Sequence, residues 1–367
     1  MLILVDFIKP VSFANDEIID SQIESLGISD FLNESENYIS NVFPDLDIEE
    51  IFNSSLEGEL NVSGMLDLII NLLGNEFKTS ISSIVSILII IVIHSVLRAI
   101  IENLGNDSVS KIAYFIQYLL IVTIIINTFT DMLDIVQDAI IEITNYMNLL
   151  VPILITLMLT TGSIVSSGVA ETALLFIINI MGVLISNFII PLVLISTTLS
   201  IVSNFSDRVH VDRLSKFIKS AIIWILGVIL TVFVCFLSIE GTLSSSVDGL
   251  TSKTAKAAVS NFIPVVGKIM GDSLDTVIGC ANILKNGVGV IGLVIIFGIA
   301  VLPIIKIAIM WALIRLVSAL CEVIADEKIV KLLDNIGDSY KILFGILVSV
   351  SVMFIVGITI VIRMTNS

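Results

Sequence analysis

Charged side chains within apolar sequence are the residues of this chain with the clearest potential for chemistry. Lys306 lies midway along an apolar run, three positions after Pro303. An ionised lysine at the centre of a bilayer costs about 2.5–3.5 kcal/mol on insertion scales, so it needs a partner or a route to water. Asp272 and Asp275 precede the run and would be that partner if their segment folded into the membrane. Alternatively, the helix tilts and the lysine stem reaches the interface.

A second group of polar and small residues leads into the same run. It contains Lys268 and Lys285, and Gly287, Gly289 and Gly292 crowd the start of the run. Small residues let helices approach closely in a membrane. Irregular backbone at membrane depth is tolerated only where it is buried in protein or lines a cavity. Two interpretations stay open. The residues either support ordinary helix packing beside a solvated loop, or they line a cavity on a substrate path.

Prolines and charges in these segments and in a matching earlier segment are our candidate cavity or helix-break residues. They are Pro152, Pro191, Pro264, Lys268, Asp272, Asp275, Lys285, Pro303 and Lys306. The chain has two histidines, His94 and His210, and three cysteines that are far apart in sequence. These spacings fit neither a metal site nor a disulfide framework. We predict no catalytic residues, no metal and no cofactor, and we do not expect an enzyme.

The elements that position these residues are predicted to be transmembrane helices. The chain is 56% hydrophobic with a mean hydropathy of +1.08, against about 45–50% apolar residues in soluble domains. A hydrocarbon core about 30 Å thick is crossed by about 20 helical residues, and backbone groups in lipid must be satisfied within the helix. Six runs meet these conditions: Ile81–Leu97, Ile112–Leu133, Ala173–Val202, Ala221–Ile239, Val288–Leu320 and Ile342–Ile362. We therefore predict an all-α, polytopic membrane helical bundle that contacts membrane lipid.

Charge is distributed unevenly along the chain. The net charge of −16 and the pI near 4.4 argue against nucleic acid as a partner. Residues 1–80 carry sixteen acids and two lysines. Within them, residues 1–14 resemble a degenerate export signal, and residues 15–78 have the spacing of an acidic, extracytoplasmic helical region. That region is either a solvent-facing domain or a surface that docks other proteins.

Basic connectors predict the topology, because lysine and arginine favour the cytoplasmic side. The connectors 98–111, 203–219 and 321–341 carry lysine or arginine, and we call them the basic connectors, whereas 134–146 has three acids and no base. If the acidic N-terminal region lies outside, 98–111 lies inside and 134–146 outside. The connector 203–219 then returns to the inside only if a single crossing lies between residues 146 and 203. We therefore interpret 147–162, which is short and contains Pro152, as re-entrant or interfacial.

Proline spacing predicts an internal duplication. Pro152 and Pro264 are 112 residues apart, as are Pro191 and Pro303. After the first two transmembrane helices (79–146), we expect repeat 1 over 147–240 and repeat 2 over 252–362, each a re-entrant or amphipathic segment followed by two spans. Both basic connectors fall on one face, so the repeats are parallel. Pro191 and Pro303 are expected to kink their helices.

Several segments resemble the stage III sporulation protein AE family over essentially the whole chain. They are Glu76-Phe-Lys, Asp248-Gly-Leu-Thr-Ser-Lys-Thr-Ala-Lys256, Asn261-Phe-Ile-Pro-Val-Val-Gly-Lys268, Leu284-Lys-Asn-Gly-Val-Gly and Pro303-Ile-Ile-Lys306. The resemblance implies an endospore-forming Firmicute and a multi-pass protein of the mother-cell-derived outer forespore membrane. It also implies membership of a secretion-like transenvelope complex, with other stage III sporulation subunits and a cytoplasmic ATPase as partners, that supports forespore development after engulfment. It supplies no catalytic residues.

Two functions follow as hypotheses. In the first, the chain is a membrane subunit of that channel complex, its acidic region docks partners and its bundle forms or closes a passage. In the second, it is a stand-alone secondary transporter for a small solute, since proline-broken repeats are also typical of such proteins.

Overall fold

The chain folds into long helices that run side by side. The computed structural model describes residues 16–40, 43–44, 46–57, 63–102, 107–161, 164–205, 211–262 and 266–363. Within these residues the structure has no strands, and six of its helical stretches are long and apolar enough to cross a membrane. The predicted all-α, polytopic membrane bundle with six spans is confirmed. The internal repeats stay a prediction.

Three short helices precede the membrane helices. They are α2 (Asp16–Ser25), α3 (Ile28–Ile39) and α4 (Ile48–Glu57). The long helices follow as α5 (Ser63–Glu102), α6 (Asp107–Thr160), α7 (Ile164–Leu184), the π-helix η1 (Ile185–Ile189), α8 (Ile190–Phe205), α9 (Asp212–Phe262), α10 (Val266–Cys321) and α11 (Glu327–Arg363). The spans lie in α5, α6, α7–α8, α9, α10 and α11. The predicted region 15–78 therefore comprises α2–α4 and the beginning of α5, which continues into the first span.

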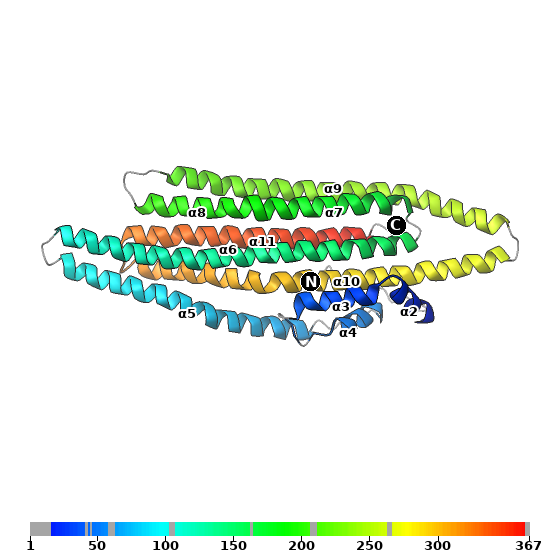
Figure 1. Cartoon of the computed structure of the whole chain (residues 1–367), viewed down its shortest axis with the longest axis horizontal. Helices are drawn as coiled ribbons and strands as arrows, with labels where there is room; N and C mark the ends of the chain where they lie inside the picture. The colour runs from blue at the N-terminus through cyan, green and yellow to red at the C-terminus, as the bar shows by residue number, and fades with distance from the viewer. Residues whose placement is uncertain are drawn as a thin grey trace.

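Helix α10 is the centre of the bundle, because it packs against α5, α6, α9, α11 and all three short helices. Figure 1 shows the C-terminal ends of α5, α8 and α10 at the same end of the molecule as the N-terminal ends of α6, α9 and α11. Ser95 of α5 donates a hydrogen bond of 2.5 Å to the carbonyl oxygen of Ile324, just after α10. We call this the basic end, since the basic connectors adjoin it, and the opposite one the far end. The expected grouping of the basic connectors agrees with this arrangement.

Helix α6 departs from the expected boundaries. Residues 134–146 were expected to form an acidic loop and 147–162 a re-entrant segment, but α6 continues through both to Thr160. The helix contains no glycine, and its one proline, Pro152, lies two turns before its end. Nothing in residues 134–146 breaks the backbone ladder, so the charges lie on a helix surface. The expected loop at 134–146 is wrong, and the membrane topology stays a prediction.

The boundary between the expected repeats also falls inside regular helices. Helix α9 passes through residues 240–252 and reaches Phe262, and α10 begins at Val266 and continues through 266–279. Asp275 and Lys306 thus lie 31 residues apart on one helix, which is about 47 Å at 1.5 Å per residue. Pairing of Lys306 with Asp272 or Asp275 within one chain is excluded, because the segment does not fold back.

The two predicted proline kinks differ. Pro191 is the second residue of α8, two positions after the last residue of η1. A proline has no backbone N–H for the carbonyl four residues earlier, and the five-residue π-turn accommodates that missing bond. Pro303 lies inside α10 without any change of helix type, and its side chain is buried. Only the first proline is accompanied by a local change of backbone.

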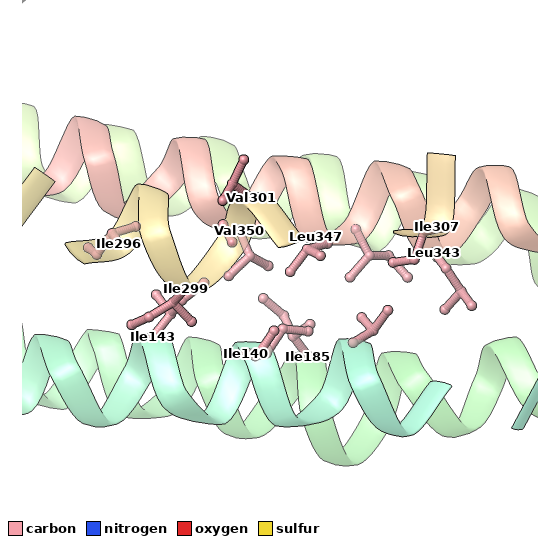
Figure 2. Close-up of a cluster of buried hydrophobic side chains, with 14 of the residues drawn as sticks. Ile140, Ile143, Ile185, Ile296, Ile299, Val301, Ile307, Leu343, Leu347 and Val350 are labelled. Atoms are coloured by element: carbon pink, nitrogen blue, oxygen red, sulfur yellow. The ribbon is translucent and has the colours of Figure 1, made fainter. Parts of the chain in front are cut away.

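Branched aliphatic side chains fill the middle of the bundle. Figure 2 shows side chains of α10 and α11 facing those of α6 and η1, among them Ile299, Leu347, Ile140 and Ile185. These four are at most 4% exposed. The interior at this level is a packed core, which fits the helix-packing interpretation of the α10 sequence.

Candidate functional site

The short helices α3 and α4 are held on α10 by contacts at two glycines. A Cβ atom on Gly298 would lie 2.7 Å from Ile39 and 3.5 Å from Phe43. One on Gly287 would lie 2.9 Å from Leu56 and 3.0 Å from Phe52 of α4. Such distances leave no room for a side chain, so glycine is what lets these helices lie directly on α10.

Tyr146 of α6 anchors α3 from a second side. Its ring is buried and lies 5.1 Å from the ring of Tyr38 and 6.2 Å from that of Phe31, centroid to centroid. Its hydroxyl shares a 3.5 Å hydrogen bond with the buried Ser35 hydroxyl. Aromatic pairs of this kind add about 0.5–1.5 kcal/mol to area burial. The short helices are therefore part of the folded bundle and not a tethered domain.

The outer surface of the short helices is acidic. Residues 16–57 contain no lysine or arginine. Nine of their acids are exposed: Asp20, Glu24, Asp30, Glu34, Glu36, Asp47, Glu49, Glu50 and Glu57. Asp47 also caps α4, since its Oδ1 accepts hydrogen bonds from the backbone N–H of Glu49 and Glu50 at 2.9 and 3.1 Å.

Helix α6 extends this acidic surface. Asp131, Asp134, Asp138 and Glu142 are all exposed, and their spacing of three or four residues puts them on one helix face. Burial raises the pKa of Tyr38 on α3, and the nearby carboxylates of Glu34 and Glu142 raise it further. Carboxylates of both α3 and α6 thus lie close enough to the Tyr38 hydroxyl to raise its pKa. We call the exposed acids of α2–α4 and of this α6 face the acidic surface.

At the basic end, α10 and α11 are joined by a cluster of charged and polar side chains. Arg315 donates to the Asp334 carboxylate at 2.9 Å and also to Asp338 one turn later. Ser318 donates to the same Asp334 oxygen at 2.9 Å. Two carboxylates on one face of α11 thus share one guanidinium from α10 near the end of the bundle.

Hydroxyl groups extend the polar contacts to α8 and α9. The buried hydroxyl of Thr197 donates to that of Ser339 at 2.8 Å, and Ser200 and Ser215 share a 2.5 Å hydrogen bond. Lys219 of α9 donates to the carbonyl oxygen of Asn335 at 3.0 Å. Interhelical hydrogen bonds between membrane helices fix their register, so four helices are locked together at the basic end.

The lysines among the predicted site residues have different surroundings. The side chain of Lys285 is fully buried, and its Nζ has no hydrogen-bond partner among the described residues. Lys306 is half-buried on the same helix. Lys268, Asp272 and Asp275 belong to the first turns of α10, but their side chains lie outside the described residues.

The structure does not bring the predicted prolines together with these charges. Pro152 is half-buried near the far end of α6, Pro191 is exposed beside η1, and Pro303 is buried in α10. Pro264 lies outside the described residues. The set is therefore spread along the bundle and does not converge on one cavity.

Sequence reasoning missed the polar cluster at the basic end. Arg315 was assigned no role, although Asp334 and Asp338 show the i, i+4 spacing of one helix face. Ser196, Thr197 and Ser200 show a similar spacing in α8. These spacings were the available signal, but their partners become visible only when the helices are packed.

Comparisons with known proteins agree with the architecture. A protein-family model described as "Stage III sporulation protein AE (spore_III_AE)" matches residues 46–365. The "Stage III sporulation protein AE" of Bacillus subtilis (strain 168) is 34% identical over 241 residues, which are 66% of this chain and 60% of that protein. The match thus spans less than two thirds of the relative's length. No solved structure matches. Because the family model covers most of the sequence, including all six spans, the chain belongs to the stage III sporulation protein AE family.

Proposed function

We propose that this chain is a multi-pass membrane subunit of the stage III transenvelope complex between mother cell and forespore, required for forespore development after engulfment. In this role it is a structural platform and has no enzymatic activity. The observation that carries the proposal is the acidic surface, which is exposed on helices that are packed rigidly against the central helix α10.

The orientation follows from the charges of the two ends. The positive-inside rule puts the basic end, with Arg213, Lys216, Lys328 and Lys331, in the mother-cell cytosol. The acidic surface then faces the space between the outer and inner forespore membranes. A cytoplasmic ATPase of the complex would meet the basic end, directly or through another subunit.

The packed interior indicates where a passage would lie. Ile140, Ile299 and Leu347 fill the middle of the bundle (Figure 2) and are at most 4% exposed. Buried side chains packed in this way leave little room for a solute at this level of the bundle. We infer that any passage in the assembly is formed between subunits and not through this one chain.

Charge reversal on the acidic surface tests the proposal. We expect Asp134→Lys with Asp138→Lys to reduce co-purification of the stage III sporulation proteins other than the cytoplasmic ATPase at least tenfold, and to lower the yield of heat-resistant spores. The matched control is Glu322→Lys with Glu327→Lys, which reverses two exposed acids at the basic end. The proposal fails if both double variants behave alike while their membrane abundance equals that of wild type.

A second experiment distinguishes a structural platform from a transporter. The purified chain is reconstituted alone in vesicles and assayed for uptake of small solutes. We expect no uptake. Saturable uptake by the chain alone would replace the proposed function with that of a secondary transporter.

A further inference from the structure

A groove between α9 and α11 lies near the basic end of the bundle. Its volume is about 630 Å³. Three lysines line it, Lys216 and Lys219 from α9 and Lys341 from α11, together with the carboxylate of Asp338. Asp338 also accepts a hydrogen bond from Arg315. Three lysines against one carboxylate give the lining of the groove an excess of positive charge.

The character of the groove changes along its length. The charged residues come first on both helices, counted from the basic end, and Ile222, Leu226, Ile342 and Ile346 follow. Leu226 lies seven residues beyond Lys219, which is about 10 Å along a helix. The groove therefore has a cationic mouth and an apolar body, in the order in which a phospholipid presents its headgroup and its acyl chains.

A hydrogen bond fixes the side chain of Lys219 at the cationic mouth of the groove. Its Nζ donates one hydrogen bond to the carbonyl oxygen of Asn335 at 3.0 Å. An ammonium group has three donors, so two have no partner among the described residues and can serve an anionic ligand. Lys216 pairs with Asp212 at 2.7 Å and is 70% exposed, which leaves its ammonium accessible from the membrane surface.

The groove opens toward the lipid side of the bundle. On α9 next to it, Phe217, Ile223 and Trp224 are 69, 61 and 72% exposed. Large exposed apolar side chains on a membrane helix mark the surface that contacts lipid, and Trp is enriched at the membrane interface. Gly345 lines the groove, and a Cβ atom added there would have no neighbour within 4 Å. The missing side chain keeps the apolar body open.

We propose that the groove binds an anionic phospholipid, with its phosphate among Lys216, Lys219 and Lys341 and an acyl chain along the apolar body. Basic pockets between membrane helices bind anionic headgroups in this way. The bound lipid would fill the space between α9 and α11 beside the polar cluster. This site is independent of the docking role proposed above.

Native mass spectrometry of the full chain in detergent tests the proposal, with phosphatidylglycerol and phosphatidylcholine of equal chain length as probes. We expect preferential retention of phosphatidylglycerol. Gly345→Leu should abolish the preference by filling the apolar body. The matched control is Gly227→Leu on α9, another glycine with open space around its Cβ position that does not line the groove.

Lysine variants test the mouth of the groove. Lys216→Gln should weaken binding about fivefold, as expected for one lysine near anionic lipid. Lys331→Gln is the control, because Lys331 is also in an i, i+4 ion pair, with Glu327, but lies outside the groove. Equal losses in the two variants would overturn the site, as would an unchanged preference in Gly345→Leu. Displacement of the lipid by millimolar glycerol phosphate would overturn the lipid assignment in favour of a free phosphate ester.

Discussion

Arg315 of α10 donates a hydrogen bond of 2.9 Å to Asp334 of α11 and joins the two helices near the connection between them, at the basic end. The same guanidinium reaches Asp338, so the contact is forked. A Cβ atom on Gly337 would lie 3.0 Å from Nε of Arg315, which shows how closely the arginine lies along α11. The hairpin from α10 to α11 is thus fixed by a geometry that a lysine cannot reproduce.

Replacing Arg315 tests this fork. Arg315→Lys is expected to lower the melting temperature by a few degrees, since a single ammonium cannot serve two carboxylates and these side chains are 37–51% exposed. Exposed pairs contribute about 0.2–1 kcal/mol. The measurement is a double-mutant cycle with Asp334→Asn by thermal unfolding in detergent. A coupling energy of zero would mean that the hydrogen bond contributes nothing to stability.

The close contact of the short helices with α10 predicts the effect of enlarging Gly298. Gly298→Leu should displace α3, because its first side-chain atom alone would lie 2.7 Å from Ile39. We expect a loss of about 1–3 kcal/mol from overpacking and rapid protease cleavage within residues 16–57. The control is Gly74→Leu in α5, where the Cβ position has open space. Equal protease resistance of the two variants would contradict the described packing.

Lys285 is expected to lower the stability of the folded chain. Its amine is buried without a hydrogen-bond partner among the described residues, and such a group costs about 1–3 kcal/mol. Lys285→Met keeps most of the volume and removes the amine, so the melting temperature should rise. Lys306→Met, at a half-buried lysine of the same helix, should change it less. A clear fall for Lys285→Met would show that the amine has a stabilising partner.

The class of the fold was predictable because hydropathy and length determine it directly. Val288–Leu320 is too long and too apolar for any structure but a buried or membrane-spanning helix, and α10 contains it. The acidic stretch 134–146 was misassigned because charge was taken as a sign of a loop. The spacing of Asp131, Asp134 and Asp138 already indicated a helix with one polar face.

Contacts between distant segments were the part that sequence could not supply. Tyr146 and Ser35 are 111 residues apart, and Thr197 and Ser339 are 142 apart. One sequence contains no signal for such pairs, because the helical period defines which residues share a face but not which face meets which. The expected pairing of Lys306 with Asp275 failed for a different reason, because the sequence between them forms one continuous helix and does not fold back.

The orientation of the two ends is the central claim, and labelling of single cysteines tests it most directly. Reporter cysteines replace the exposed Asp138 of the acidic surface and the exposed Lys331 at the basic end, after Cys235, Cys280 and Cys321 are changed to alanine. The chain is produced in vegetative cells, where the same orientation would expose the acidic surface at the outer face of the plasma membrane, and a membrane-impermeant maleimide is applied to their intact protoplasts. We expect Asp138→Cys to react and Lys331→Cys to react only after lysis. Reaction of Lys331→Cys in intact protoplasts would contradict the account.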